Sequence, residues 1–224
     1  MGSKLAFSLV LIFWGLVISS PLFASVSGLD ERACKIGSGL YENNFPFPLA
    51  KWRLPVKTTV PVTSCYGARH LLNKFYDFHY GVDFGARAKT PVSAVASGKV
   101  IWLGSMGCAG RGIVIEHKLK SGDTVFSLYK HLKKYLVISG QHVDAGQRIG
   151  LSGASGKKLD MSQAPSKRGC VLGPHLHLEF KLVRKPWTTR DVELTLKKTK
   201  GHLSDTVVGV DPSRFIPPLK DHCS

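Results

Sequence analysis

The sequence predicts an all-β fold of antiparallel sheets, with short strands and long loops. Short apolar runs follow one another with glycines between them, at residues 92–96, 99–103, 112–116, 124–131, 148–151 and 175–183. Asp123 after Gly122 marks one hairpin turn, and Gly140 marks another. Because no run has the length and periodicity of an amphipathic helix, we expect hydrogen-bonded hairpins with one exposed sheet face.

The first 27 residues have the pattern of a secretory signal peptide. Lys4 precedes an apolar run at 5–18, and small residues follow at 19–27. The apolar run is shorter than the ~20 residues of a membrane-spanning helix. We therefore predict a signal peptide at 1–27, cleaved after Ala24 or Ser27, and no stable membrane span after cleavage. The alternative is a retained N-terminal anchor.

The rest of the chain divides into three predicted segments. Residues 28–63 have a proline every few positions and few periodic apolar residues, which indicates an irregular, extended segment lying over the domain. Residues 64–216 are long enough for one domain with its own core. The region 181–224 alternates basic and β-prone residues, as at 192–196, and 217–224 is predicted to be a short tail.

The formal net charge of +16 indicates an anionic partner. Removing residues 1–27, which carry Lys4 and no acidic residue, leaves +15. Because the chain is predicted to be exported, we expect anionic envelope polymers rather than nucleic acid. The basic residues are dispersed, so a solvated surface without a partner is an equally good interpretation.

The run at 175–183 carries the first candidate functional side chains. His175, His177 and Glu179 alternate with apolar residues, which is the period of a half-buried strand. The two imidazoles therefore share one face, with their Cβ atoms about 6 to 7 Å apart. At that spacing one imidazole could bind a metal while the other moves protons.

Upstream residues supply further candidates. His79 and Asp83 are four apart, so both point the same way on an extended or helical segment, and the glycine between them allows close backbone approach. Two imidazole nitrogens and one carboxylate oxygen, with a position left for water, are a usual set for catalytic zinc. His131, which is predicted to share a strand face with Ser127 and Tyr129, is a second candidate for moving protons.

In their order along the chain, these motifs resemble those of the lysostaphin-like zinc metallopeptidases, which cut peptide cross-bridges of bacterial peptidoglycan. The resemblance covers about residues 64–180 and implies an antiparallel β-sheet metallopeptidase domain with long active-site loops. It rests on these segments: His79-Tyr80-Gly81-Val82-Asp83, Thr90-Pro91-Val92, Gly98-Lys99-Val100, Tyr129-Lys130-His131-Leu132, Val143-Asp144-Ala145-Gly146-Gln147, Ile149-Gly150 and Gly173-Pro174-His175-Leu176-His177-Leu178-Glu179. Residues 64–69 resemble the family segment that leads toward the first metal ligand.

The resemblance and the chemistry together predict the roles of five side chains. The predicted Zn²⁺ ligands are His79, Asp83 and His177, and the predicted catalytic side chains are His131 and His175. A His-Glu-x-x-His helix is missing, so histidine has to replace its glutamate as the base. Glu179 either orients a histidine from beyond the ligands or is a solvated carboxylate. The remaining histidines are predicted to be structural or solvated, and they are His70, His117, His142, His202 and His222.

Two regions depart from the family pattern. Residues 157–168 form a polar, basic insertion beside the catalytic strand, which we expect to be a cleft wall, with Asp160 as a turn residue. In some relatives the segment before the domain covers the cleft and donates an extra metal ligand. Asn43 or Asn44 could do so here, but an extended wrap without that role is the preferred interpretation.

All five cysteines lie after residue 27. In an oxidising compartment pairs are expected, and an odd number leaves at least one free or intermolecular. Cys108 and Cys170 each lie in a glycine-containing loop, and the second loop leads into the run at 175–183. We hypothesise that these two form a disulfide at the rim of the site.

The predicted function is that of an exported zinc endopeptidase, periplasmic or secreted, that hydrolyses peptide cross-links of peptidoglycan. The alternative is a non-catalytic cell-wall-binding or amidase-activating module of the same fold. A third interpretation, a basic protein that binds polyanions, predicts an affinity that falls with salt regardless of metal. The sequence does not distinguish a D,D cross-link from a glycine bridge as the substrate.

Overall fold

The computed structural model describes residues 52–71, 75–160, 162–163, 169–183, 188–199, 203, 207–216 and 219. Several predictions fall outside these residues, namely the signal peptide at 1–27, Asn43, Asn44, Cys34 and Cys223.

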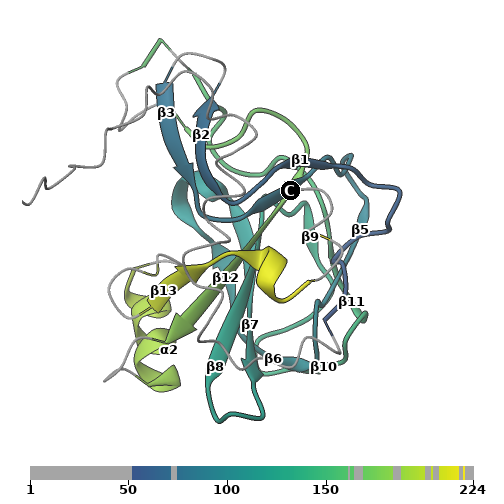
Figure 1. Cartoon of the computed structure of the whole chain (residues 1–224), viewed down its shortest axis with the longest axis vertical. Coiled ribbons are helices and arrows are strands. Elements are labelled where there is room, and N and C mark those ends of the chain that lie inside the picture. Colours follow the sequence, from purple (N-terminus) through teal and green to yellow (C-terminus); the bar gives the residue numbers. More distant parts are fainter. Residues whose placement is uncertain are drawn as a thin grey trace, which may run out of the picture.

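An antiparallel sheet of eight strands is the centre of the fold, as predicted (Figure 1). Seven strands follow in the order β1-β4-β12-β8-β7-β6-β10, and β13 pairs with the second half of β12. The strands are β1 (Val62–Ser64), β4 (Val82–Phe84), β6 (Gly98–Ser105), β7 (Arg111–Lys118), β8 (Thr124–Lys130), β10 (His142–Val143), β12 (Leu176–Val183) and β13 (Val207–Val210).

Two smaller sheets complete the fold. A hairpin of β2 (Gly67–Leu71) and β3 (Phe75–His79) stands at one end of the main sheet (Figure 1). The other sheet has the order β5-β11-β9, from β5 (Pro91–Ser93), β11 (Arg148–Leu151) and β9 (Lys134–Tyr135). Short 3-10 turns lie at η1 (Gly107–Ala109) and η3 (Pro212–Arg214). Each of the six apolar runs overlaps one strand, which confirms the predicted strands, although the run at 92–96 is strand only in its first two residues.

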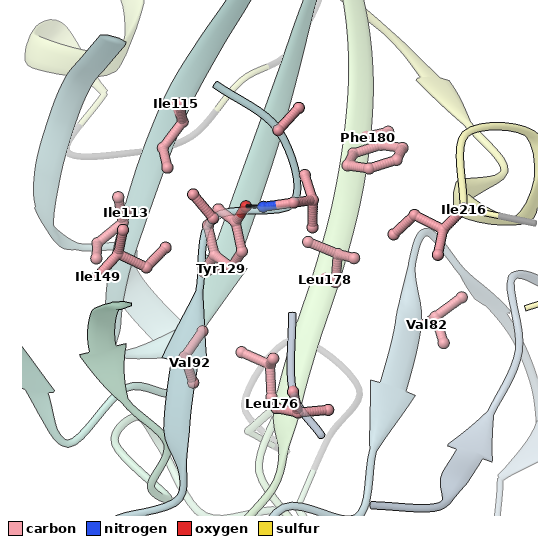
Figure 2. Close-up of a cluster of buried hydrophobic side chains, with 14 of the residues drawn as sticks. Val82, Val92, Ile113, Ile115, Tyr129, Ile149, Leu176, Leu178, Phe180 and Ile216 are labelled. Carbon is pink, nitrogen blue, oxygen red and sulfur yellow. Dashed lines mark hydrogen bonds between the residues drawn. The ribbon is translucent and has the colours of Figure 1, made fainter. Parts of the chain in front are cut away.

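Alternation along β12 separates the core from the site. Leu176, Leu178 and Phe180 are fully buried and point into the main apolar cluster beside Tyr129 of β8 (Figure 2). Burial of each such side chain contributes about 1.5–3 kcal/mol. Because side chains of a strand alternate between faces, the residues between them lie on the opposite face of the sheet.

One prediction about the C-terminal region is wrong. Residues 192–196 do not continue a β-type alternation but belong to helix α2 (Thr189–Lys198). The Thr188 hydroxyl accepts the Asp191 N–H, and the Asp191 carboxylate accepts the Thr188 N–H, so a capping box starts the helix. Val192 and Leu196 lie one turn apart and are both buried in a second apolar cluster with Phe126.

Segments at both ends of the described chain close the main core. The Trp52 ring contacts Phe180 and Phe215, with centroids 5.1 and 5.0 Å apart. Phe215, Ile216 and Leu219 are fully buried in the same cluster. Among the described residues, no helix has both the length and the apolar character needed to cross a bilayer.

Candidate active site

The connection between β3 and β4 turns two predicted ligands toward β12. His79 ends β3, and Asp83 of β4 pairs with His177 across the sheet. Gly81 lies between them, so close to β12 that a Cβ would be 2.3 Å from Leu178 O and 2.8 Å from His177 Nε2. The close approach predicted at this glycine is confirmed, and it lets the connection pass directly over His177.

The structure brings His79, Asp83 and His177 together. His79 Nε2 is 3.2 Å from Asp83 Oδ1 and 3.0 Å from His177 Nδ1, and His177 Nδ1 is 2.7 Å from Asp83 Oδ1. Within the part of the chain that the structure describes, this is the one group of three or more His, Cys, Asp or Glu side chains that could hold a metal ion.

The outward-facing nitrogen of each imidazole is engaged elsewhere. His79 Nδ1 donates to Cys65 O at 2.7 Å, and His177 Nε2 donates to Glu179 Oε1 at 2.8 Å. With their outer nitrogens donating in this way, the neutral forms of both rings have lone pairs on His79 Nε2 and His177 Nδ1 that face Asp83, whereas the protonated rings donate to the Asp83 carboxylate from these same nitrogens. Two lone pairs and a carboxylate oxygen in mutual contact form an arrangement that a cation stabilises.

This donor set fits zinc. Imidazole nitrogen and carboxylate oxygen are both zinc ligands, and bonds of about 2.0–2.1 Å in a tetrahedral site put neighbouring ligand atoms about 3.3 Å apart. The three separations in the cluster, from 2.7 to 3.2 Å, are close to that value.

Glu179 orients His177 and is not a solvated carboxylate. It is 5% exposed, Lys130 Nζ contacts its Oε1, and Lys181 Nζ lies 3.2 Å from its Oε2. Burial on its own would raise the pKa of Glu179, but Lys130 and the hydrogen bond from His177 hold that pKa well below its ordinary value. The Glu179 carboxylate is therefore charged at neutral pH and accepts a hydrogen bond from His177 Nε2.

Arg69 and Ser64 support the cluster, although the sequence predicted no role for either. Arg69 donates to Asp83 Oδ2 at 3.3 Å and to Ser64 Oγ at 2.9 Å. Ser64 Oγ in turn lies 3.2 Å from His79 Nδ1. Residues 64–69 resemble the family segment before the first ligand, so the sequence did indicate that this segment lies near the site. It did not indicate that Arg69 pairs with Asp83.

The two predicted proton carriers lie beside the cluster. The ring centroids of His131 and His175 are 4.4 Å apart, and that of His131 is 5.9 Å from that of His177. His175 Nε2 is 3.7 Å from Asp83 Oδ1. Four imidazoles and one carboxylate therefore gather at a single place on the sheet.

Both proton carriers present the same ring nitrogen to the site. His175 Nδ1 donates to Gly173 O at 2.9 Å, and His131 Nδ1 donates to Ser155 O at 3.3 Å. With Nδ1 protonated, each ring has a lone pair on Nε2 that can accept a proton.

His131 reaches the site through a bend in the backbone. β8 ends at Lys130, and His131 has a φ of 63°, in the left-handed region. Ser127 and Tyr129 stay buried on the core face, so the prediction that His131 shares a face with them is wrong. Left-handed residues other than glycine are uncommon and cluster at functional sites.

The hypothesised disulfide between Cys108 and Cys170 is present. It joins η1 to the segment before β12, across 62 residues of sequence. Next to Cys108, the carbonyl of Ala109 accepts the His131 N–H at 3.3 Å, so the cross-link borders a backbone contact of the site. Cys65 is disulfide-bonded as well.

The described part of the insertion at 157–168 contains a turn. Asp160 Oδ1 accepts hydrogen bonds from the backbone N–H and the hydroxyl of Ser162, at 3.0 and 2.7 Å. This confirms Asp160 as a turn residue.

Burial and local charge determine which groups are ionised. Burial would raise the pKa of Asp83, but hydrogen bonds from His177 and His79 outweigh it and lower that pKa. Burial lowers the pKa of His79, and burial together with His175 and His177 lowers the pKa of His131 to about 3. For His177, the bonds to Asp83 and Glu179 outweigh burial and raise the pKa. At neutral pH Asp83 is thus an anion and His131 a neutral base.

His117 is structural, as predicted. It is buried and hydrogen-bonds to Ser97 O at 2.9 Å and to Ser127 Oγ at 2.7 Å, far along the sheet from the cluster. His142 is exposed. The side chains of the other three histidines lie outside the described part of the structure.

A carboxylate and two imidazoles around a common point, with two more imidazoles alongside, form a candidate metal centre of the kind that metal-dependent hydrolases use. Comparison with known proteins agrees. The profile of Peptidase family M23 matches residues 77–189, half of the chain. The chain belongs to this family, and the predicted resemblance to lysostaphin-like peptidases is confirmed.

Individual relatives cover parts of the chain. Peptidoglycan DD-endopeptidase ShyA of Vibrio cholerae is 36% identical over 136 residues, 60% of this chain and 28% of ShyA. Lysostaphin of Staphylococcus simulans is 37% identical over 102 residues, 45% of this chain and 17% of lysostaphin. Among solved structures, the catalytic domain of that lysostaphin is 28% identical, with a TM-score of 0.46. The match covers 70% of this chain and 91% of the lysostaphin catalytic domain. The chain thus spans less than a third of the curated relatives it matches.

Proposed function

We propose that the protein is an exported zinc endopeptidase, periplasmic or secreted, that hydrolyses peptide cross-links of bacterial peptidoglycan. The observation that carries the proposal is the convergence of His79, Asp83 and His177 beside two imidazoles that are free to accept protons. Family membership and the names of the relatives support the substrate. Because ShyA is named a DD-endopeptidase, we favour a D,D cross-link over a glycine bridge.

His79, Asp83 and His177 would hold the ion. Bound there, zinc would polarise the scissile carbonyl and make water more acidic. The hydrogen bonds from His79 to Cys65 and from His177 to Glu179 keep both rings aimed at the site before substrate arrives, so little reorganisation is needed.

We assign proton uptake from the attacking water to His175. Its Nε2 is 3.7 Å from Asp83 Oδ1, so the imidazolium that forms is stabilised by a neighbouring carboxylate. The oxygen of the attacking water bonds to the carbonyl carbon as His175 takes up one of the water protons. The amide C–N bond then breaks, and this proton passes to the leaving amine. The second group that can carry this proton is His131, which is neutral and whose ring centroid lies 4.4 Å from that of His175.

The test compares His175→Ala with His177→Ala on purified peptidoglycan. We expect His175→Ala to retain zinc and to lose about 10²- to 10⁴-fold in hydrolysis, the usual contribution of a general acid–base group. His177→Ala should lose the metal itself. Chelator should abolish wild-type activity and zinc should restore it. Mass spectrometry of the released fragments identifies the bond, and His142→Ala is the matched control at an exposed histidine.

Two outcomes would contradict the proposal. Full zinc content with full activity in either variant would refute the assigned roles. Wild-type protein that binds zinc and cuts no cross-linked muropeptide would favour the non-catalytic wall-binding or amidase-activating module.

A further inference from the structure

Two aromatic rings on either side of a proposed ligand are exposed. Phe78 and Tyr80 flank His79 and are 43% and 55% exposed, while His79 is 3% exposed. Among the large apolar side chains that are exposed in the described part of the chain, these two are the aromatic ones, and the others are aliphatic. Exposed rings grouped at one place mark a binding surface more often than isolated ones do.

The two rings belong to a connected group. Tyr66 and Phe78 meet edge to face with centroids 5.3 Å apart, and Phe78 and Tyr80 are 4.9 Å apart. Lys181 Nζ lies 5.1 Å from the centroid of the Tyr80 ring. We call Tyr66, Phe78 and Tyr80 the aromatic patch. The three rings contact one another, and Lys181 makes a cation–π contact with Tyr80. These contacts restrict the side-chain rotamers, so little conformational entropy remains to be lost on binding.

The aromatic patch continues the face that carries the site. His177, Glu179 and Lys181 alternate along β12, so the lysine beneath Tyr80 is on the same face as the proposed ligand. Lys181 is four positions after His177 on the strand, a distance of about 13 Å. Tyr80 itself adjoins Gly81, which lies against His177 and Glu179.

We propose that the aromatic patch binds the glycan strand of peptidoglycan, through stacking of N-acetylated sugar rings on Phe78 and Tyr80. This inference rests on the proposed function. The C–H faces of pyranose rings stack on aromatic rings, and flat, partly exposed aromatics with little freedom are suited to that contact. In the substrate about three to four peptide residues join a sugar to a cross-link, a span of up to roughly 10–14 Å. The roughly 13 Å of strand between His177 and Lys181, the residue that contacts the Tyr80 ring, falls within that span.

Charge also favours this occupant. Peptidoglycan carries free carboxylates on its peptides, and the chain has a net charge of +16. Lys181 places an ammonium group directly beside the Tyr80 ring.

The experiment uses full-length protein and two probes. The first is titration with peptide-free glycan oligomers, which requires no catalysis. Phe78→Ala/Tyr80→Ala should weaken binding by about tenfold or more, the effect of losing one to two stacking contacts, while Tyr80→Trp should retain it. Leu194→Ala, at a 53% exposed leucine on α2, is the control and should bind as the wild type does.

The second probe compares cross-linked muropeptides that carry sugars with glycan-free cross-linked peptides. The double variant should show a raised KM on the first and unchanged kinetics on the second, with unchanged zinc content. Wild-type protein that shows no glycan binding, or equal losses on both substrates, would overturn the inference. So would loss of self-association in the double variant without any glycan binding, because the patch would then join two copies. Failure to cleave the glycan-free peptide would count against the proposed function instead.

Discussion

At the scale of single residues, Glu179 shows how much the site depends on groups outside the proposed ligand set. Its carboxylate accepts a hydrogen bond from His177, and Lys130 and Lys181 compensate its negative charge. Removing the charge weakens the orientation of His177 and leaves two ammonium groups without their carboxylate.

We predict that Glu179→Gln lowers zinc affinity by about 10- to 100-fold, as is usual for partners of metal-bound histidines. Competition with a chromophoric chelator measures this. Glu193→Gln, on the helix α2, is the control and should bind zinc as tightly as the wild type. Equal affinity in all three proteins would show that His177 needs no partner.

The sequence revealed those residues whose position follows from strand alternation alone. His177 and Glu179 were predicted on one face, and they lie on one face. Lys130 and Arg69 were not predicted as part of the site, because their partners lie on other strands and cross-strand pairing is not written in local spacing. His131 was chosen correctly as a neighbour of the cluster but for a wrong reason, since a left-handed bend brings it there.

At the scale of elements, the disulfide Cys108–Cys170 connects two loops that border the site. The Cys108 carbonyl accepts the N–H of Lys157, and the neighbouring Ala109 carbonyl accepts that of His131. The bond therefore constrains the loop that fixes the position of a proposed proton carrier.

We predict that Cys108→Ser/Cys170→Ser loses up to about 4 kcal/mol of unfolding free energy, the chain-entropy value for closing a loop of this length. Loosening of His131 should also reduce kcat by up to about a hundredfold, because small misplacements of catalytic groups are costly. Zinc content should not change. Denaturant unfolding, metal analysis and steady-state kinetics check the three statements, and a fall in zinc content would mean that the disulfide supports the ligands instead.

Helix α2 was missed because its residues satisfy two periods at once. Val192, Leu194 and Leu196 alternate as in a strand, and the first and last of them are also one helical turn apart. Thr188 followed by Asp191 was the local signal for a helix start. Their capping box favours the helix because it satisfies backbone N–H groups that, in a strand, would need a neighbouring strand as hydrogen-bond partner.

At the scale of the whole molecule, pH acts on stability through His117. Burial lowers the pKa of this imidazole to about 4. In the unfolded chain a histidine titrates near 6.5, so between about pH 6.5 and 4 the unfolded state binds a proton that the folded state does not. Stability is therefore lost as the pH falls through this window.

We predict that this loss is about 2 to 3 kcal/mol between pH 7 and pH 4.5. In His117→Gln the dependence of unfolding free energy on pH should be smaller by that amount, whereas His142→Gln, at an exposed histidine, should behave as the wild type. Chemical denaturation at both pH values measures it. Parallel pH dependences in all three proteins would contradict the role of His117.

The ion-binding cluster unites residues that are 98 positions apart, since His79 meets His177 only when β12 has joined β4. A nascent or half-assembled polypeptide consequently lacks the proposed metal centre. Under the proposed function, hydrolysis would begin only with the completed sheet, and a misassembled copy would be inert.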